Sequence, residues 1–462
     1  MRKTLLAMPV AALMLATVAT TTPAHAATPR TPLSITSVTA APGPKVGEIT
    51  LKWSQDGRYT TGYVLETALT SFSKTNPEMA KTGRRTRLLN IPKNLRTITL
   101  SAAQVHSAGA GVASGNHLYF RFYAVNTSSG GTATRAYPYL QAMTPKPLPP
   151  QASGTKMRIA SFNVRTAKAT TDARTWIQRA PDVAAQIVNR NPGLAALQEL
   201  GPGRADGLTG ATNGTARQTE SLITALQAAN GTKYALVRTT PYVQPGLPSG
   251  TQGTRILYDT SRYTLQSDCP DTTDGRKYSP SCSIVLPLLP TDAETARRRA
   301  AVAQFQDRVT KKRFFFVSAH LDERHSDNLT TERSYDSLRK SQANTIVEGV
   351  AKLNTANLPV IIGGDMNSWQ NNRVGNSPHD TLVAQGFYDA SAAVTRVNIK
   401  YTTMNHFNTT LPASSQGFGS RLDMLFVKGA KGSARFENVM KVTDPARPSD
   451  HNMVVSDIVL GG

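Results

Sequence analysis

The stretch VIIGGDMNS, residues 360–368, joins a run of strand-forming residues to a carboxylate and an amide. Three β-branched residues are typical of a buried strand, and two glycines separate them from Asp365 and Asn367. The end of a buried strand has no structural need for these two polar side chains. We therefore expect them to face a ligand that binds oxygen and nitrogen atoms.

Other apolar segments in this half of the chain also carry polar residues at their ends. The predicted strands are 158–163, 194–199, 313–320, 422–427 and 453–460. If the last two run antiparallel to the others, their polar residues meet at one sheet edge, where open α/β sheets bind ligands. These residues are Asn163, Glu199, His320, Asp365, Asn367, Asp423, Asp450 and His451.

Helical segments alternate with these strands. Residues 175–190 are expected to form a helix, with further helices over 221–229 and 335–353. The pattern predicts an α/β fold with a mixed sheet. In the first helix we expect one buried face, formed by Ile177, Val183, Ile187 and Val188.

The polar residues suit one chemistry. Oxygen ligands without cysteine favour Mg²⁺, Mn²⁺ or Ca²⁺ over zinc. A carboxylate beside a histidine is a general-base arrangement, and an amide with a second histidine can hold phosphate oxygens. Together they indicate metal-assisted attack of water on a phosphate ester.

Structural roles remain open for several of these residues. Asp365 and Asn367 also fit a turn closed by side-chain hydrogen bonds, and Asp423 fits an ion pair with Arg421. The run 297–299, three arginines, fits a solvated turn or a phosphate clamp. Trp369 fits a packing role or a stacking platform for a base.

Six short motifs in this order resemble the endonuclease/exonuclease/phosphatase superfamily. They are SFN (161–163), LQE (197–199), SAHLD (318–322), GGDMN (363–367), SRLDMLFV (420–427) and SDHN (449–452). The resemblance covers about residues 156–462. It implies a four-layer α/β sandwich, in which two packed mixed sheets lie between helices, and a metal-dependent phosphoric ester hydrolase.

The resemblance also implies roles for individual residues. Metal ligation falls to Glu199, with Asn163 and Asp450 helping, and Mg²⁺ or Mn²⁺ is the expected ion, with Ca²⁺ a further candidate. His451 is the implied catalytic histidine and Asp423 its partner. The remaining roles are activation of water by Asp365, phosphate binding by Asn367, and phosphate contact with leaving-group protonation by His320.

One departure separates the chain from the pancreatic type of deoxyribonuclease, in which a Glu pairs with the second histidine. No Asp or Glu occurs between Glu220 and Asp259, so we expect His320 to lack that partner.

The first 150 residues have a different organisation. Residues 1–26 resemble a secretory signal peptide, with Arg2 and Lys3 before an apolar run and an Ala24-His25-Ala26 cleavage site. About seven short strands over 33–145 predict a separate all-β, immunoglobulin-like sandwich. ITLKW and YFRFYAVN within it resemble strands of a fibronectin type III domain. The proline-rich segment 146–155 is expected to be a stiff linker that leaves this part free to move, and 156–462 the catalytic domain.

Charge and cysteine content suggest the surroundings and the partners. The net charge is +22, and residues 27–150 hold 14 Lys/Arg (16 less the first two) against 4 Asp/Glu. Such proteins attract nucleic acid and other anionic polymers or surfaces. Export to an oxidising compartment favours a disulfide between Cys269 and Cys282 over two free thiols. No apolar stretch is long enough to span a membrane.

An extracellular nuclease acting on DNA, or RNA, is therefore the leading expectation, as a monomer. A sphingomyelinase-like phospholipase and a phosphomonoesterase are the enzyme alternatives. An adhesive module that binds polyanions is the alternative without catalysis.

Overall fold

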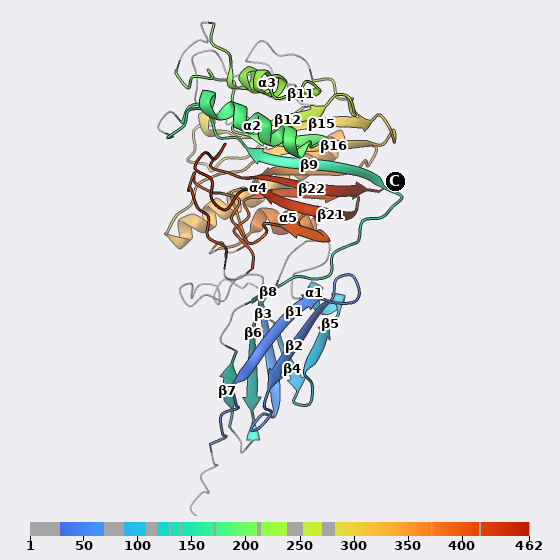
Figure 1. Ribbon diagram of the computed structural model, residues 1–462, viewed down its shortest axis with the longest axis vertical. Helices are drawn as coiled ribbons and strands as arrows, with labels where there is room; N and C mark the ends of the chain where they lie inside the picture. The colour runs from blue at the N-terminus through green and yellow to red at the C-terminus, as the bar shows by residue number, and fades with distance from the viewer. Residues whose placement is uncertain are drawn as a thin grey trace, which may run out of the picture.

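The computed structural model describes residues 28–68, 87–107, 118–128, 131–137, 141–169, 172–209, 214–237, 253–269, 282–370, 372, 374–414 and 417–461. The predicted signal peptide lies outside these residues. The segment 246–252 also lies outside them; it belongs to the stretch before Arg255 that contains no acidic residue. Two parts are visible in Figure 1, an all-β part near the N-terminus and a larger α/β part.

The N-terminal part contains two antiparallel sheets. One has the order β1-β2-β5, and the other has the order β4-β3-β6-β7 with β8 paired to β6. A short helix, α1 (Ala102–Ser107), follows β5. The strands are β1 (Ile35–Pro42), β2 (Ile49–Gln55), β3 (Gly62–Ala68), β4 (Arg87–Pro92), β5 (Thr97–Leu100), β6 (Leu118–Asn126), β7 (Ala133–Ala136) and β8 (Gln141–Met143).

Alternation of apolar residues builds the core between these sheets. In β2 the side chains of Ile49, Leu51 and Trp53 are buried, whereas Lys52 and Ser54 are exposed. The Trp53 ring lies against Tyr63 and Phe122, with centroids 5.2 and 4.9 Å away. This part is therefore a separate all-β unit with its own core, as predicted.

The α/β part contains two seven-stranded sheets. The first has the order β11-β12-β10-β9-β22-β21-β19; the second has the order β13-β15-β16-β17-β20-β18, with β14 on β15. The first comprises β9 (Thr155–Asn163), β10 (Leu194–Gln198), β11 (Tyr234–Val237), β12 (Arg255–Asp259), β19 (Thr395–Val397), β21 (Ala430–Val439) and β22 (Met453–Leu460). The second comprises β13 (Tyr263–Leu265), β14 (Ser283–Val285), β15 (Arg299–Asp307), β16 (Arg313–His320), β17 (Val360–Asp365), β18 (Tyr388–Asp389) and β20 (Asp423–Lys428).

Helices cover the outer faces. Apolar residues of α2 (Trp176–Arg190) and α3 (Gln218–Ala228) share a core with the first sheet, and those of α4 (Leu329–Leu353) and α5 (Ser377–Ala384) share one with the second. The predicted four-layer sandwich is therefore confirmed (Figure 1).

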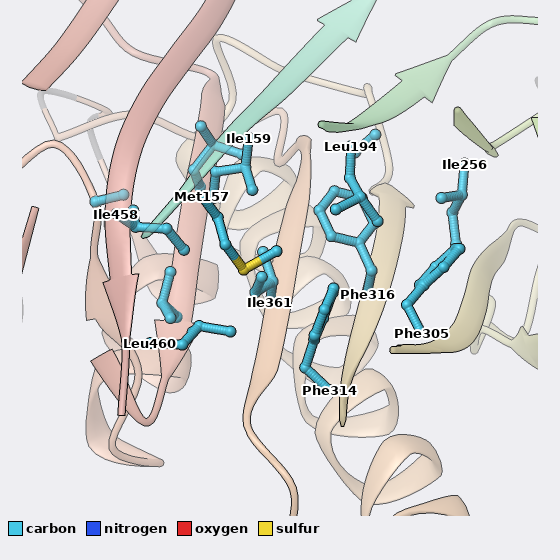
Figure 2. Packing of buried hydrophobic residues seen from close by; sticks show 14 of the residues in the cluster. Met157, Ile159, Leu194, Ile256, Phe305, Phe314, Phe316, Ile361, Ile458 and Leu460 are labelled. Atoms are coloured by element: carbon cyan, nitrogen blue, oxygen red, sulfur yellow. The ribbon is translucent and has the colours of Figure 1, made fainter. Parts of the chain in front are cut away.

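A third core fills the space between the two sheets. Figure 2 shows Met157 and Ile159 of β9 facing Phe314, Phe316 and other residues of the second sheet. Burying a side chain of this size stabilises a fold by about 1.5–3 kcal/mol. The sheets approach closely at Gly363, where an added Cβ would come within 2.8 Å of the Ala196 side chain. This explains the first glycine of the pair before Asp365.

Strand directions decide where the polar residues lie. Neighbours β9 and β10 are parallel, as are β16 and β17, whereas β20 runs antiparallel to β17 and β22 antiparallel to β9. Asp365 pairs directly with both His320 and Asp423 in this register. The condition under which the polar residues meet at one edge is thus fulfilled.

Some local predictions were wrong. Ile177 is 55% exposed, although Val183 and Ile187 of the same helix are fully buried. Helix α4 begins at Leu329, six residues before its predicted start, because the Asn328 side chain accepts hydrogen bonds from the N–H groups of Thr330 and Thr331. Strand β9 begins at Thr155, inside the predicted linker.

The linker contacts both parts. On one side the Gly47 N–H donates to the Lys146 carbonyl at 3.0 Å; on the other, the Gln151 N–H donates to the Lys431 carbonyl at 3.0 Å. The sequence predicted that the linker leaves the N-terminal part free to move. These hydrogen bonds restrain the linker more than that prediction assumed. A disulfide joins Cys269 to Cys282, with their Cα atoms 5.7 Å apart.

Candidate active site

The centre of the site is a buried acid–histidine pair. Asp423 is the first residue of β20 and His451 lies two residues before β22, so the pair bridges the two sheets. Asp423 Oδ2 lies 2.9 Å from His451 Nδ1. Burial alone would lower the pKa of His451, but attraction to Asp423 and Asp365 outweighs it, and the pKa lies well above its ordinary value.

Asp365 lies between the two histidines. Its Oδ2 atom is 3.6 Å from Nε2 of His451 and 3.6 Å from Nε2 of His320. Its other oxygen accepts the Asn367 N–H at 3.0 Å, so the predicted side-chain turn is present. Burial raises the pKa of Asp365. A single carboxylate is therefore shared by the two predicted catalytic histidines.

Asn163 connects Asp365 to Glu199, which follows strand β10 of the first sheet. The Asn163 amide donates to Glu199 Oε1 and to Asp365 Oδ2, both at 3.1 Å. Glu199 has a left-handed backbone (φ 56°), which is unfavourable for a residue with a side chain. A hydrogen bond from the Thr166 N–H to Glu199 Oε2, 2.9 Å long, helps to hold the carboxylate in this position.

Asp450 has a different environment. One of its oxygens lies 3.3 Å from Arg165 Nη1, and the other accepts a hydrogen bond from Ser449 at 3.2 Å. Arg165 in turn pairs with Asp172. The predicted metal helper Asp450 is thus held by an arginine in this structure.

His320 is the last residue of β16 and is buried. Burial, the charge of Arg298 and then that of His451 lower its pKa well below the ordinary value. Its Nδ1 atom is buried and has no hydrogen-bond partner among the described residues.

Arg298 belongs to the arginine run 297–299, for which the sequence left a phosphate clamp as the alternative to a solvated turn. Its side chain is only 10% exposed, and it pairs with Glu323. Burial lowers its pKa, while Asp322, Asp365 and Glu199 oppose that shift, so its charge acts on the site carboxylates. The interpretation of the arginine run as a solvated turn was therefore wrong at this position. The sequence feature that could have indicated this role is the position of Arg298, a cation immediately before an apolar strand.

The site residues fit a divalent cation. Ligand atoms of Asp365, Asp423 and His451 all lie within 4.8 Å of one another. Asp423 Oδ1 is buried and has no hydrogen-bond partner within the part of the chain that the structure describes. A buried oxygen of this kind suits a hard cation. This group overlaps the predicted site but differs from the predicted ligands Glu199, Asn163 and Asp450.

All eight predicted residues thus lie at one edge of the sandwich. The alternative pairing of Asp423 with Arg421 does not occur, since Arg421 binds Asp389.

The family model for the endonuclease/exonuclease/phosphatase family matches residues 160–451. The chain belongs to this family. Members of the family are phosphoric ester hydrolases, and the protein is therefore an enzyme of that class.

Several solved structures resemble this chain. An endonuclease/exonuclease/phosphatase from Bacteroides vulgatus is 19% identical, with 66% of this chain and 99% of that chain covered and a TM-score of 0.48. Mannosyl-6-phosphatase from Bacteroides thetaiotaomicron is 19% identical over 66% and 100% of the two chains, with a TM-score of 0.47. The human Nocturnin catalytic domain is 14% identical over 68% and 99%, with a TM-score of 0.41. No curated protein matches the chain.

Among the described residues, no helix is both long and apolar enough to cross a membrane.

Proposed function

We propose that the protein is a secreted phosphodiesterase that hydrolyses DNA with the help of Mg²⁺ or Mn²⁺. The observation that carries the proposal is the continuous series of contacts from Asp423 through His451 and Asp365 to His320. Two histidines that share a central carboxylate bring two groups capable of proton transfer to one place.

Each residue has a defined task in this proposal. Asp423 fixes the orientation of His451, whose Nε2 atom faces Asp365. Asp365 orients the attacking water, and His320 contacts the scissile phosphate and the leaving oxygen. A bound divalent cation neutralises charge on the phosphoryl oxygens. Glu199, Asn163 and the Asp365–Asp423–His451 group supply the atoms that would hold it.

Phosphate binding is assigned to Asn367 and Arg298. Asn367 is fixed because its side chain donates to the Leu321 carbonyl at 3.0 Å. Arg298 Nη1 is buried without a hydrogen-bond partner in the described ranges, so a donor is available for a phosphate oxygen. A guanidinium suits phosphate better than an ammonium because it presents donors in a fixed plane.

The choice of DNA rests on charge and on the expected export. Both parts of the chain are basic, and a polymer of phosphodiesters is the substrate that such a surface attracts most strongly. We further propose that the N-terminal part is a fibronectin type III-like module that anchors polyanions. Its two sheets, with orders β1-β2-β5 and β4-β3-β6-β7, support this assignment.

Parallel assays test the proposed function. Protein lacking residues 1–26 is incubated with Mg²⁺ or Mn²⁺ and, separately, plasmid DNA, RNA, sphingomyelin and a phosphomonoester. We expect cleavage of DNA with the highest kcat/KM, and loss of cleavage in excess chelator. Faster turnover of sphingomyelin or of the monoester would reassign the substrate, and full activity in chelator would refute the metal requirement.

A truncation tests the anchoring role. Removal of residues 27–150 should leave the kcat/KM for a small phosphodiester unchanged and weaken action on long DNA, most clearly at low salt. Loss of activity on the small substrate by a folded truncated protein would contradict the proposal.

A further inference from the structure

An aromatic pair borders the proposed site and takes no part in the chemistry described above. His325 follows β16 by five residues and Trp369 follows Asn367 by two. Their ring centroids are 5.0 Å apart, with planes inclined at 58°. Two residues of chain span at most about 7 Å, so Trp369 lies close to the proposed phosphate ligand Asn367.

Both rings reach the surface. The His325 side chain is 33% exposed, and Trp369 is only partly buried. A tryptophan that served packing alone would be expected in one of the cores, and it belongs to none of them. Partly exposed aromatic rings beside a phosphate site are the usual platforms for stacked bases.

The pair is held from behind by a buried carboxylate. The carboxylate of Glu332 in α4 lies 3.0 Å from His325 Nδ1 and accepts a hydrogen bond from the Ser326 N–H at 2.8 Å. It also accepts hydrogen bonds from Arg339 at 3.0 Å and from Asn372 at 3.3 Å. Arg339 alone would neutralise this charge. The additional bonds fix the loops that carry His325 and Trp369.

The phosphate ligand is fixed to the same loop. Asn367 donates its side-chain N–H to the Leu321 carbonyl, between His320 and His325. Arg324, next to His325, pairs with Asp292 and Asp322, both at 2.7 Å. The aromatic pair is therefore rigid relative to the phosphate site, as a binding subsite requires.

We infer that His325 and Trp369 form a stacking subsite for the nucleobase adjacent to the scissile phosphate. The inference rests on the proposed function, because it assumes a nucleic-acid substrate. A base is separated from its phosphate by one sugar, a spacing that suits the short distance along the chain from Asn367 to Trp369. Stacking is tolerant of sequence. The subsite therefore favours a nucleotide that carries a base over an abasic one, and it does not discriminate among the bases.

Tryptophan fluorescence gives a direct test. The chain has three tryptophans, and Trp53 and Trp176 are only 4% and 1% exposed, so Trp369 is the accessible one. With Mg²⁺ present, deoxyadenosine 5′-monophosphate should quench the emission saturably, whereas 2-deoxyribose 5-phosphate should not. Trp369→Phe should abolish the response, and Trp53→Phe, the matched control, should retain it. Equal quenching by both ligands, or none, would overturn the subsite.

Cleavage measurements provide the second test. An oligonucleotide is compared with one that carries abasic analogues on both sides of the scissile phosphate. Trp369→Leu should lower kcat/KM about 10-fold on the first substrate and leave the second unchanged, whereas Trp369→Phe should keep the preference. Equal losses on both substrates would show a purely structural role. If the wild type cleaves neither oligonucleotide, that result counts against the proposed function. The fluorescence measurement would still decide whether the stacking subsite exists.

Discussion

Two buried histidine–aspartate groups have their carboxylates on neighbouring strands of one sheet and differ in how their polar atoms are satisfied. One is His451 with Asp423, at the start of β20; the other is His379 of α5 with Asp389 of the neighbouring strand β18. In both groups burial alone would lower the histidine pKa, and the carboxylates raise it, to about 9 for His379. Burial and charge therefore do not distinguish them.

The partners of the two carboxylates do distinguish them. Asp389 accepts two bonds from Arg421, at 2.7 and 2.5 Å, and one from the Ser391 N–H at 2.9 Å, in addition to its contact with His379. Asp423 Oδ1, by contrast, has no partner in the described segments, nor has His320 Nδ1. A saturated group stabilises the fold, whereas unsatisfied buried atoms mark a place kept for a ligand.

The largest expected effect separates the groups by activity. His451→Ala and Asp423→Asn should each lower kcat about 10³-fold or more, since the catalytic histidine or its orienting carboxylate is removed. The double variant should lose little beyond the single variants, because the two residues act as a unit. Kinetics on a small phosphodiester measures this, and a double loss equal to the product of the single losses would contradict the coupling.

The second prediction reverses the comparison. Asp389→Asn should lower the free energy of unfolding by about 3–5 kcal/mol, because it leaves the buried charges of Arg421 and His379 without their carboxylate. Activity per folded molecule should change little. Denaturant unfolding and kinetics on the folded fraction measure the two effects. A loss of kcat with unchanged stability would place Asp389 in the chemistry.

The third prediction concerns pH. The pKa of His379 is raised to about 9, so its imidazolium stabilises the folded state. This contribution, on the order of 3 kcal/mol, is complete below about pH 6.5 and is lost as pH rises through about 9. Unfolding measured from pH 6 to 10 should show the decline in the wild type and a flatter profile in His379→Gln. Identical profiles would refute the assignment.

The smallest expected effect concerns Arg298. Arg298→Gln should lower kcat/KM about 10-fold, because one donor to the phosphate is lost. Arg297→Gln is the matched control, since Arg297 pairs with Glu294 at the surface, and it should behave as wild type. Equal behaviour of the two variants would remove Arg298 from the site.

The sequence predicted those features that depend on one strand at a time. A buried strand followed by Asp365 or His320 is visible in the local pattern, and the parallel or antiparallel order then brings such ends together. The group of His379, Asp389 and Arg421 was not predicted, because its members come from three separate segments and only the fold joins them. The role of Arg298 stayed open in the sequence because a run of arginines has the same appearance whether it is solvated or buried.

The most direct test of the account compares the two histidines in one assay. Plasmid DNA is incubated with wild type, His451→Ala and His379→Gln in Mg²⁺, with and without excess chelator, at a pH and temperature where all three are folded. We predict cleavage by wild type and His379→Gln, no cleavage by His451→Ala, and no cleavage by any of them in chelator. Cleavage by folded His451→Ala at the wild-type rate would contradict the account.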